Sequence, residues 1–256
     1  MKKLLVFSAA LLSIGSALGQ STNTGTDFNQ HIIKLNVPAV VARNFSFQYE
    51  YGIKENMSVA LGFRFMPKGP IPLSGLFENI GQSDDATGDG RSAFSEFLDQ
   101  GRMSNWALTP EFRYYFGKQP LSGFYIAPYL RFGGFNIDWT YDFENSEGEM
   151  QEAPIDGRIS TFSAGALVGA QWHLSEQFVL DLWIIGPAYG TMKINATATT
   201  DMTNLTPERR QEIEEDLSIE IFGNEVNTRI NDDGIRANVR TPFAGLRTGV
   251  CIGFKF

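Results

Sequence analysis

The stretch "RTGVCIGFKF", Arg247–Phe256, closes the chain and decides the fold. Val250, Ile252, Phe254 and Phe256 occupy every second position, and the residues between them are small or charged. A period of two is typical of a β-strand whose faces meet different environments. Chain ends usually fray in polar sequence, so this terminus is predicted to be held in a sheet.

The same alternation recurs in seven earlier segments. They are "HIIKLNVPAV" (31–40), "NFSFQYEY" (44–51), "MSVALGFRF" (57–65), "NWALTPEFRYYF" (105–116), "GFYIAPYLRF" (123–132), "STFSAGALVGAQWHL" (160–174) and "FVLDLWI" (178–184). With the terminal stretch they predict eight antiparallel strands.

The connections between these segments are of two kinds that alternate along the chain. "KEN" (54–56), "GKQPLS" (117–122) and "SEQ" (175–177) are tight turns, whereas the links 67–104, 145–157 and 200–236 are long and polar. Short periplasmic turns and long extracellular loops are typical of transmembrane β-barrels of the bacterial outer membrane. An even strand count requires the segment at 31–40, whose outer turn, near 41–43, would be short. The prediction is an all-β, up-and-down barrel of eight strands.

The N-terminal segment "MKKLLVFSAALLSIGSALGQ" has two lysines, an apolar run and then small residues. This is the pattern of a cleaved secretory signal peptide over residues 1–19, which leaves 20–256 as one barrel domain. The apolar run is too short for a membrane anchor, which needs about 20 residues. We therefore expect an exported protein of the cell outer membrane.

Composition narrows the classes of function. The chain carries 21 Lys and Arg against 29 Asp and Glu, and without Lys2 and Lys3 the net charge is −10. A nucleic-acid partner requires a basic surface, so none is expected. Cys251 is the only cysteine, which excludes a disulfide within the chain.

The two faces of the predicted strands differ in charge. The apolar faces are nearly free of charge, and the opposite faces carry Lys34, Glu50, Arg64, Glu111, Arg113, Arg131, Asp181 and Arg247. Alternation alone fits a lipocalin-type barrel equally well. The Gly- and Ser-rich polar faces, the turn asymmetry and the aromatic residues near strand ends favour lipid on the apolar side. Those aromatic residues are Tyr51, Trp106, Phe116, Trp139, Trp172 and Phe178.

Charges inside a narrow barrel must be paired, so a plugged interior is predicted. Strand register suggests Glu111 with Arg131 or Arg64 in a middle layer. Beneath it, Arg113 is predicted to pair with Glu50 or Asp181.

The chain resembles the small outer-membrane barrels: the OmpA transmembrane domain, OmpX and opacity-type proteins. "IIKLNVP…NFSFQYEY" and "GFYIAPYLRFGGF" resemble more narrowly a poorly characterised outer-membrane family of Bacteroidetes-type bacteria. The resemblance implies contact with outer-membrane lipid and lipopolysaccharide and assembly by the barrel assembly machinery. It also implies that Val250, Ile252, Phe254 and Phe256 form the C-terminal assembly signal. Two outer loops are longer than in a minimal barrel.

Few residues suggest chemistry. His31 and His173 lack a Cys or His partner at metal-ligand spacing, and Ser163 and His173 would lie about 33 Å apart along one strand. The acidic stretch Ser83–Gly90 lacks calcium-loop spacing, and short helices are predicted at 92–100 and 206–217. No catalytic residue, cofactor or metal site is predicted.

The favoured function is therefore that of a structural or surface-interaction barrel that presents its loops outside the cell to an unidentified partner. The alternatives are a narrow pore for small solutes and an enzyme that acts on lipid or lipopolysaccharide.

Overall fold

The computed structural model describes residues 30–72, 100–144, 150–199, 220–221, 224–225, 227–231 and 233–256. Its long strands are β1 (Gln30–Asn36), β2 (Phe45–Lys54), β3 (Met57–Pro70), β4 (Arg102–Tyr115), β5 (Gly123–Glu144), β6 (Met150–His173), β7 (Phe178–Thr199) and β11 (Gly234–Lys255). A helix, α2 (Val37–Val41), follows β1, and the short strands are β8 (Glu220–Ile221), β9 (Asn224–Glu225) and β10 (Asn227–Asn231).

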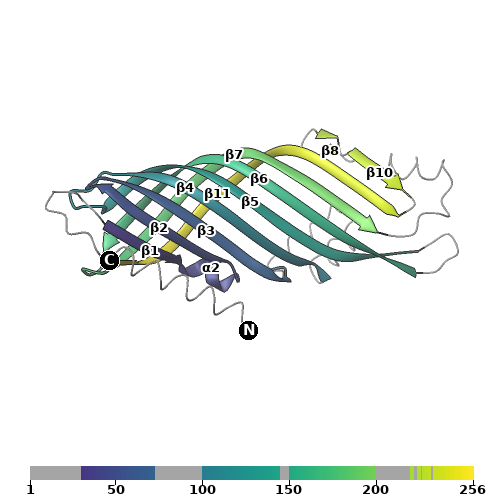
Figure 1. Ribbon diagram of the computed structural model, residues 1–256, viewed down its shortest axis with the longest axis horizontal. Coiled ribbons are helices and arrows are strands. Elements are labelled where there is room, and N and C mark those ends of the chain that lie inside the picture. Colours follow the sequence, from purple (N-terminus) through teal and green to yellow (C-terminus); the bar gives the residue numbers. More distant parts are fainter. Residues whose placement is uncertain are drawn as a thin grey trace, which may run out of the picture.

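The eight long strands form one closed antiparallel ring, as predicted. Each strand pairs with the next along the chain, and β11 pairs with both β7 and β1 (Figure 1). The seam between β1 and β11 runs from Ile32 opposite Lys255 to Asn36 opposite Cys251. Closure leaves no unpaired strand edge in this part of the ring, which is the condition for β-structure in hydrocarbon.

Three tight turns close one end of the barrel. At this end the backbone N–H of Phe256 donates to the carbonyl of His31 at 3.0 Å, which fixes the last residue against the first strand. The N–H of Lys255 donates to Gln177 of the β6–β7 turn at 2.7 Å. The apolar terminus is thus held in the sheet, as the alternation in "RTGVCIGFKF" predicts.

The first strand is shorter than predicted. It ends at Asn36, and the predicted strand residues 37–40 belong instead to α2. Pro38 lies in the first turn of the helix, where its missing N–H costs nothing, and the Asn36 side chain accepts from the N–H of Ala39 at 3.4 Å. The helix contacts β11 at the outer mouth of the barrel.

Several outer links are shorter than predicted because strands continue into them. β5 and β6 stay paired as far as Glu144 opposite Met150, so most of the predicted loop 145–157 is strand. The last part of the predicted loop 200–236 is also strand, because β11 begins at Gly234 and β10 (Asn227–Asn231) pairs with it. Continued backbone pairing satisfies polar groups that a loop would expose. The predicted helices at 92–100 and 206–217, the signal peptide and Ser83–Gly90 lie outside the described residues, except for Gln100.

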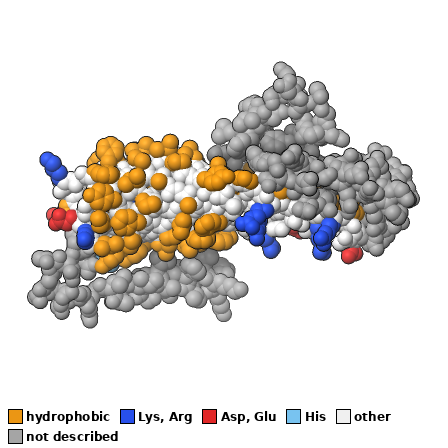
Figure 2. Space-filling view, turned by 90° about the horizontal axis from the view of Figure 1, so that it is seen from above, with side chains coloured by type: hydrophobic (Ala, Val, Ile, Leu, Met, Phe, Trp, Pro, Cys, Tyr) orange, Lys and Arg blue, Asp and Glu red, His pale blue; other side chains and the backbone are white. Residues whose placement is uncertain are grey.

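The outer surface carries a band of hydrophobic side chains around the half of the barrel nearer the tight turns (Figure 2). Lys and Arg side chains lie beyond the band on its outer side. Leu61, Trp106 and Phe112 belong to the exposed apolar set, as predicted. Trp139 is an exception, because its position on β5 places it on the same face as inward-pointing Tyr125 and Tyr129, and it was wrongly assigned to the lipid face. Among the described residues, no helix is long and apolar enough to cross a bilayer.

A bulge interrupts the alternation in β7. Trp183 and Gly186 are both buried, and the two residues between them, Ile184 and Ile185, both face outward. The register of β7 shifts here against both of its neighbours. The bulge brings Gly186 rather than a larger side chain to the inner wall, where the Tyr129 hydroxyl donates to its carbonyl at 2.7 Å.

Candidate functional site in the barrel interior

The eight charged residues assigned to the interior all point into the barrel. Six of them are almost completely buried: Lys34, Glu50, Glu111, Arg113, Asp181 and Arg247. Arg64 and Arg131 are partly buried and line a cavity. Successive side chains of a strand point to opposite faces of the sheet. The neighbours of these residues therefore point outward, and the charged side chains share one enclosed interior.

Lys34 forms the centre of the layer nearest the tight turns. Its ammonium group lies 2.5 Å from Glu50 Oε2 and 2.7 Å from Asp181 Oδ2, and it also donates to Gln171 Oε1. Gln171 is held in turn, because its amide donates to the carbonyl of Leu121 at 2.8 Å. All three donors of the ammonium group therefore have acceptors, as a buried charge requires.

Arg113 connects this layer to the one above it. Its Nη1 lies 2.8 Å from Asp181 and 3.4 Å from Glu50, so both partners predicted for Arg113 are found. Its Nη2 donates to Gln48 at 2.7 Å, and its Nε lies 2.5 Å from Glu111. One guanidinium thus joins carboxylates from three strands, for which its rigid fork of donors is suited.

Two tyrosines complete the lower network. Tyr115 donates to Glu50 at 2.6 Å, and Tyr125 donates to Asp181 at 2.7 Å. The two rings are tilted by 50° with 5.1 Å between their centroids, and the Arg113 guanidinium lies 4.5 Å from the centroid of the Tyr125 ring. Together these aromatic side chains fill the space around the ion pairs, and we name the set of Lys34, Gln48, Glu50, Ser58, Arg113, Tyr115, Tyr125, Gln171 and Asp181 the polar plug.

Glu111 has different partners from those predicted. It pairs with Arg113 on its own strand and with Arg247 from β11, not with Arg131 or Arg64. Arg247 lies over Trp183 at 3.9 Å from the ring, which helps to hold its guanidinium toward Glu111. The prediction was wrong because it considered contacts between adjacent strands, and Arg247 reaches Glu111 across the barrel.

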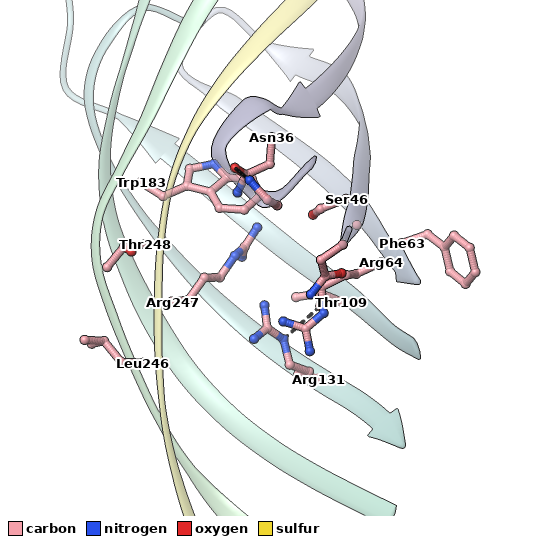
Figure 3. Close-up of a pocket in the computed structure, with 13 residues that line it drawn as sticks. Asn36, Ser46, Phe63, Arg64, Thr109, Arg131, Trp183, Leu246, Arg247 and Thr248 are labelled. Atoms are coloured by element: carbon pink, nitrogen blue, oxygen red, sulfur yellow. Dashed lines mark hydrogen bonds between the residues drawn. The ribbon is translucent and has the colours of Figure 1, made fainter. Parts of the chain in front are cut away.

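Above this pair lies a cavity of about 180 Å³, which we name the arginine chamber. The side chains of Arg64, Arg131 and Arg247 point into it from three strands, and Thr109 and Ser46 supply hydroxyl groups (Figure 3). Ala39 of α2 and Asn44 border it on the side of the outer mouth. Arg131 donates to the Thr109 hydroxyl at 3.2 Å.

Glycines opposite tyrosines make room for the interior aromatic rings. Gly165 lies opposite Tyr129 and Gly169 lies opposite Tyr125 in the β5–β6 ladder. A Cβ at Gly169 would come within 2.4 Å of the Tyr125 ring and 2.8 Å of the Leu182 carbonyl oxygen. The Gly-rich inner face seen in the sequence therefore has a packing cause.

The residues considered for chemistry are held in separate places. His31 Nδ1 lies 2.6 Å from the Tyr49 hydroxyl and its ring packs on Phe256, whereas His173 Nε2 lies 2.9 Å from the Pro120 carbonyl. Ser163 and Cys251 are both buried in the inner wall. Within the described residues, no three His, Cys, Asp or Glu side chains form a group able to hold a metal ion.

A separate group of charges lies beyond the hydrophobic band. Lys68 contacts Asp138 at 2.5 Å, and Asp138 lies opposite Asp156 in the β5–β6 ladder. The hydrogen bond from Lys68 holds the pKa of Asp138 below its usual range. The neighbouring carboxyl group of Asp138 raises the pKa of Asp156.

Three uncharged polar residues of the plug were not predicted as members of the interior network. Gln48, Ser58 and Gln171 are buried and bind the charged groups. Their signal was available, since each occupies an inward position of its strand. The partners of these residues could not be predicted, because they depend on which strands face each other across the ring.

The chain was compared with known proteins at the levels of structure and of sequence. Two solved structures resemble the chain: a major outer membrane protein from Thermus thermophilus (12% identity, TM-score 0.41, covering 91% of this chain and 100% of that one) and the N-terminal β-barrel domain of Pseudomonas aeruginosa OprF (11% identity, TM-score 0.25, covering 90% and 100%). No curated protein matches the chain. Residues 80–213, more than half of the chain, match a family described as "Protein of unknown function (DUF3575)". The chain therefore belongs to the DUF3575 family, and its eight long strands form a closed antiparallel barrel.

Proposed function

We propose that the protein is a structural or surface-interaction barrel of the outer membrane, exported with a cleaved signal peptide, whose interior is closed to ion flow. It acts through its outer strand extensions and loops, not through catalysis. Its surroundings in this proposal are outer-membrane lipid and lipopolysaccharide, and the barrel assembly machinery inserts it.

The polar plug carries this proposal. Lys34, Arg113, Glu50 and Asp181 are fully buried and balance one another in charge. Lys34 of β1 bonds to residues of β2, β6 and β7, and Arg113 of β4 bonds to residues of β2 and β7, so the network crosses the barrel interior. Breaking such a network exposes uncompensated buried charge, which opposes opening of a water path.

A non-enzymatic role is supported by the placement of the considered residues. His173 contacts a backbone carbonyl at the turn end of the barrel, while Ser163 lies ten residues away along β6. Within the described residues, this pair does not meet as a nucleophile and its base must.

Planar-bilayer recording of the purified barrel tests the proposal. The parent protein should show no steady conductance, and Arg113→Ala should conduct because it removes the side chain that joins Glu50, Asp181 and Glu111. Lys68→Ala is the control, since Lys68 is an exposed cation outside the hydrophobic band. Steady conductance by the parent would instead establish the narrow pore. Membrane fractionation with heat-modifiable gel migration tests the location.

A further inference from the structure

Within the part of the chain that the structure describes, the barrel interior carries more positive than negative charge. Five cationic side chains, Lys34, Arg64, Arg113, Arg131 and Arg247, face three carboxylates, Glu50, Glu111 and Asp181. The plug is neutral in itself, and Glu111 is shared between Arg113 and Arg247. The excess of two positive charges therefore belongs to Arg64 and Arg131, in a chain whose formal net charge is −8.

Neither of these two arginines has a carboxylate partner among the described residues. Arg64 Nε is buried without a hydrogen bond, and the polar contact of Arg131 is the neutral hydroxyl of Thr109. Arg247 Nε is also buried without a partner. The three positive charges repel one another across the arginine chamber, so each guanidinium would gain from an anion placed between them.

The arginine chamber has the size and donors for such an anion. Its volume of about 180 Å³ equals roughly six water molecules at about 30 Å³ each. Planar guanidinium forks match the oxygen spacing of phosphate, and Ser46 and Thr109 add hydroxyl donors. Gly62 lines the chamber without a side chain, and a Cβ there would meet its nearest atoms at an ordinary contact distance of 3.5 Å.

We propose that the arginine chamber is a binding site for a phosphate-type oxyanion, held by Arg64, Arg131 and Arg247. The plug bars the route from the tight-turn end, so the anion enters from the outer mouth, past α2. The shared chemistry is a phosphate group, whether free or carried as the head of a lipid.

Calorimetric titration of the barrel in phosphate-free detergent micelles tests this site, with Trp183 fluorescence as a second readout because its ring lies on Arg247. Inorganic phosphate should bind saturably at one site per barrel. Arg64→Gln with Arg131→Gln should weaken binding by about tenfold or more for each guanidinium removed. The charge-matched control is Lys68→Gln with Arg102→Gln, which alters two exposed cations and should bind like the parent.

Gly62→Leu is the second variant, since it fills the arginine chamber and leaves every arginine in place. Loss of phosphate binding in this variant supports a site that depends on the shape of the chamber. Retained binding would mean that phosphate is attracted only by the overall positive charge, which would overturn the proposal. No saturable binding by the parent, or equal affinity in the double-glutamine variant, would also overturn it.

Short-chain phosphatidic acid in the same micelles identifies the source of the phosphate. Binding of inorganic phosphate alone indicates a free ion, and binding of the lipid alone indicates a headgroup. In either case, binding must be lost in the variant that combines Arg64→Gln and Arg131→Gln. Because these measurements need no conductance, a conducting barrel that binds phosphate would refute the closed interior and leave the chamber proposal standing.

Discussion

At the scale of single residues, the interior is fitted by pairing small with large side chains across neighbouring strands. Gly165 and Gly169 lie beneath the rings of Tyr129 and Tyr125, whose hydroxyls then reach the Gly186 carbonyl and Asp181. A tyrosine here performs two tasks, since its ring fills volume and its hydroxyl satisfies a buried acceptor.

Gly169→Ala should destabilise the barrel by about 1–3 kcal/mol, because the added methyl group collides with a ring and with backbone. Gly62→Ala is the matched control: it adds the same methyl group to an inward glycine of β3 at ordinary contact distance. Urea unfolding in lipid vesicles measures both variants. Equal stability of the two would show that Tyr125 moves aside without cost.

At the scale of elements, β3 shows how lipid and interior divide one strand. Val59, Leu61 and Phe63 face outward, and Ser58, Ala60 and Gly62 are buried. This alternation requires a single register in the sheet, since a slip of one residue would turn every apolar side chain inward.

Leu61→Arg should cost about 2–4 kcal/mol of folding free energy in lipid, because it places a charge near the middle of the hydrophobic band. Asn195→Arg on β7 is the control: its side chain is exposed in the strand extension beyond the band. Folding titrations in vesicles compare the two. If Leu61→Arg folds as well as the parent, the outward face does not meet lipid.

Individual elements also show which parts of the fold could be predicted from the sequence. The strands, and the side of the sheet to which each side chain points, were predictable. A strand that crosses a bilayer must alternate between apolar side chains toward lipid and other side chains toward the interior. That constraint ends outside the hydrophobic band, so β5, β6 and β11 run further than the apolar pattern. The helix α2 was missed because five residues carry no helical period, although Asn36 followed closely by Pro38 is a helix-start signal.

The interior pairing was predictable only in part. Arg113 meets Glu50 and Asp181 because these residues lie at one height. The contact of Glu111 with Arg247 depends on the shear of the ring, which the local sequence does not contain. The arginine chamber was not predicted for the same reason. The excess positive charge of Arg64 and Arg131 can be recognised only when the ion pairs of the other interior charges are known.

At the scale of the whole molecule, the polar plug ties together strands that are distant in sequence. Lys34 of β1 and Asp181 of β7 are separated by 147 residues and lie 2.7 Å apart. Arg113 of β4 reaches the same carboxylate oxygen. The plug therefore stabilises the ring as a unit rather than one hairpin at a time.

Lys34→Met and Asp181→Asn should each destabilise the barrel by about 3–5 kcal/mol, because each leaves the buried network with one uncompensated charge. The double variant should lose less than the sum of the two, with a coupling of about 0.5–3 kcal/mol. Urea unfolding in lipid for the four proteins of the cycle gives this value. Strictly additive losses would mean that water, not the opposite charge, satisfies each group.

The seam between β1 and β11 has a consequence for biosynthesis. Ile33 lies in β1, the first strand of the ring, and its partner Phe254 lies in β11, the last long strand described. The ring therefore cannot close before β11 has been made, and each earlier intermediate carries two unpaired strand edges. A chain that lacked residues 251–255 would leave β1 without its partner across the seam, so its ring would stay open.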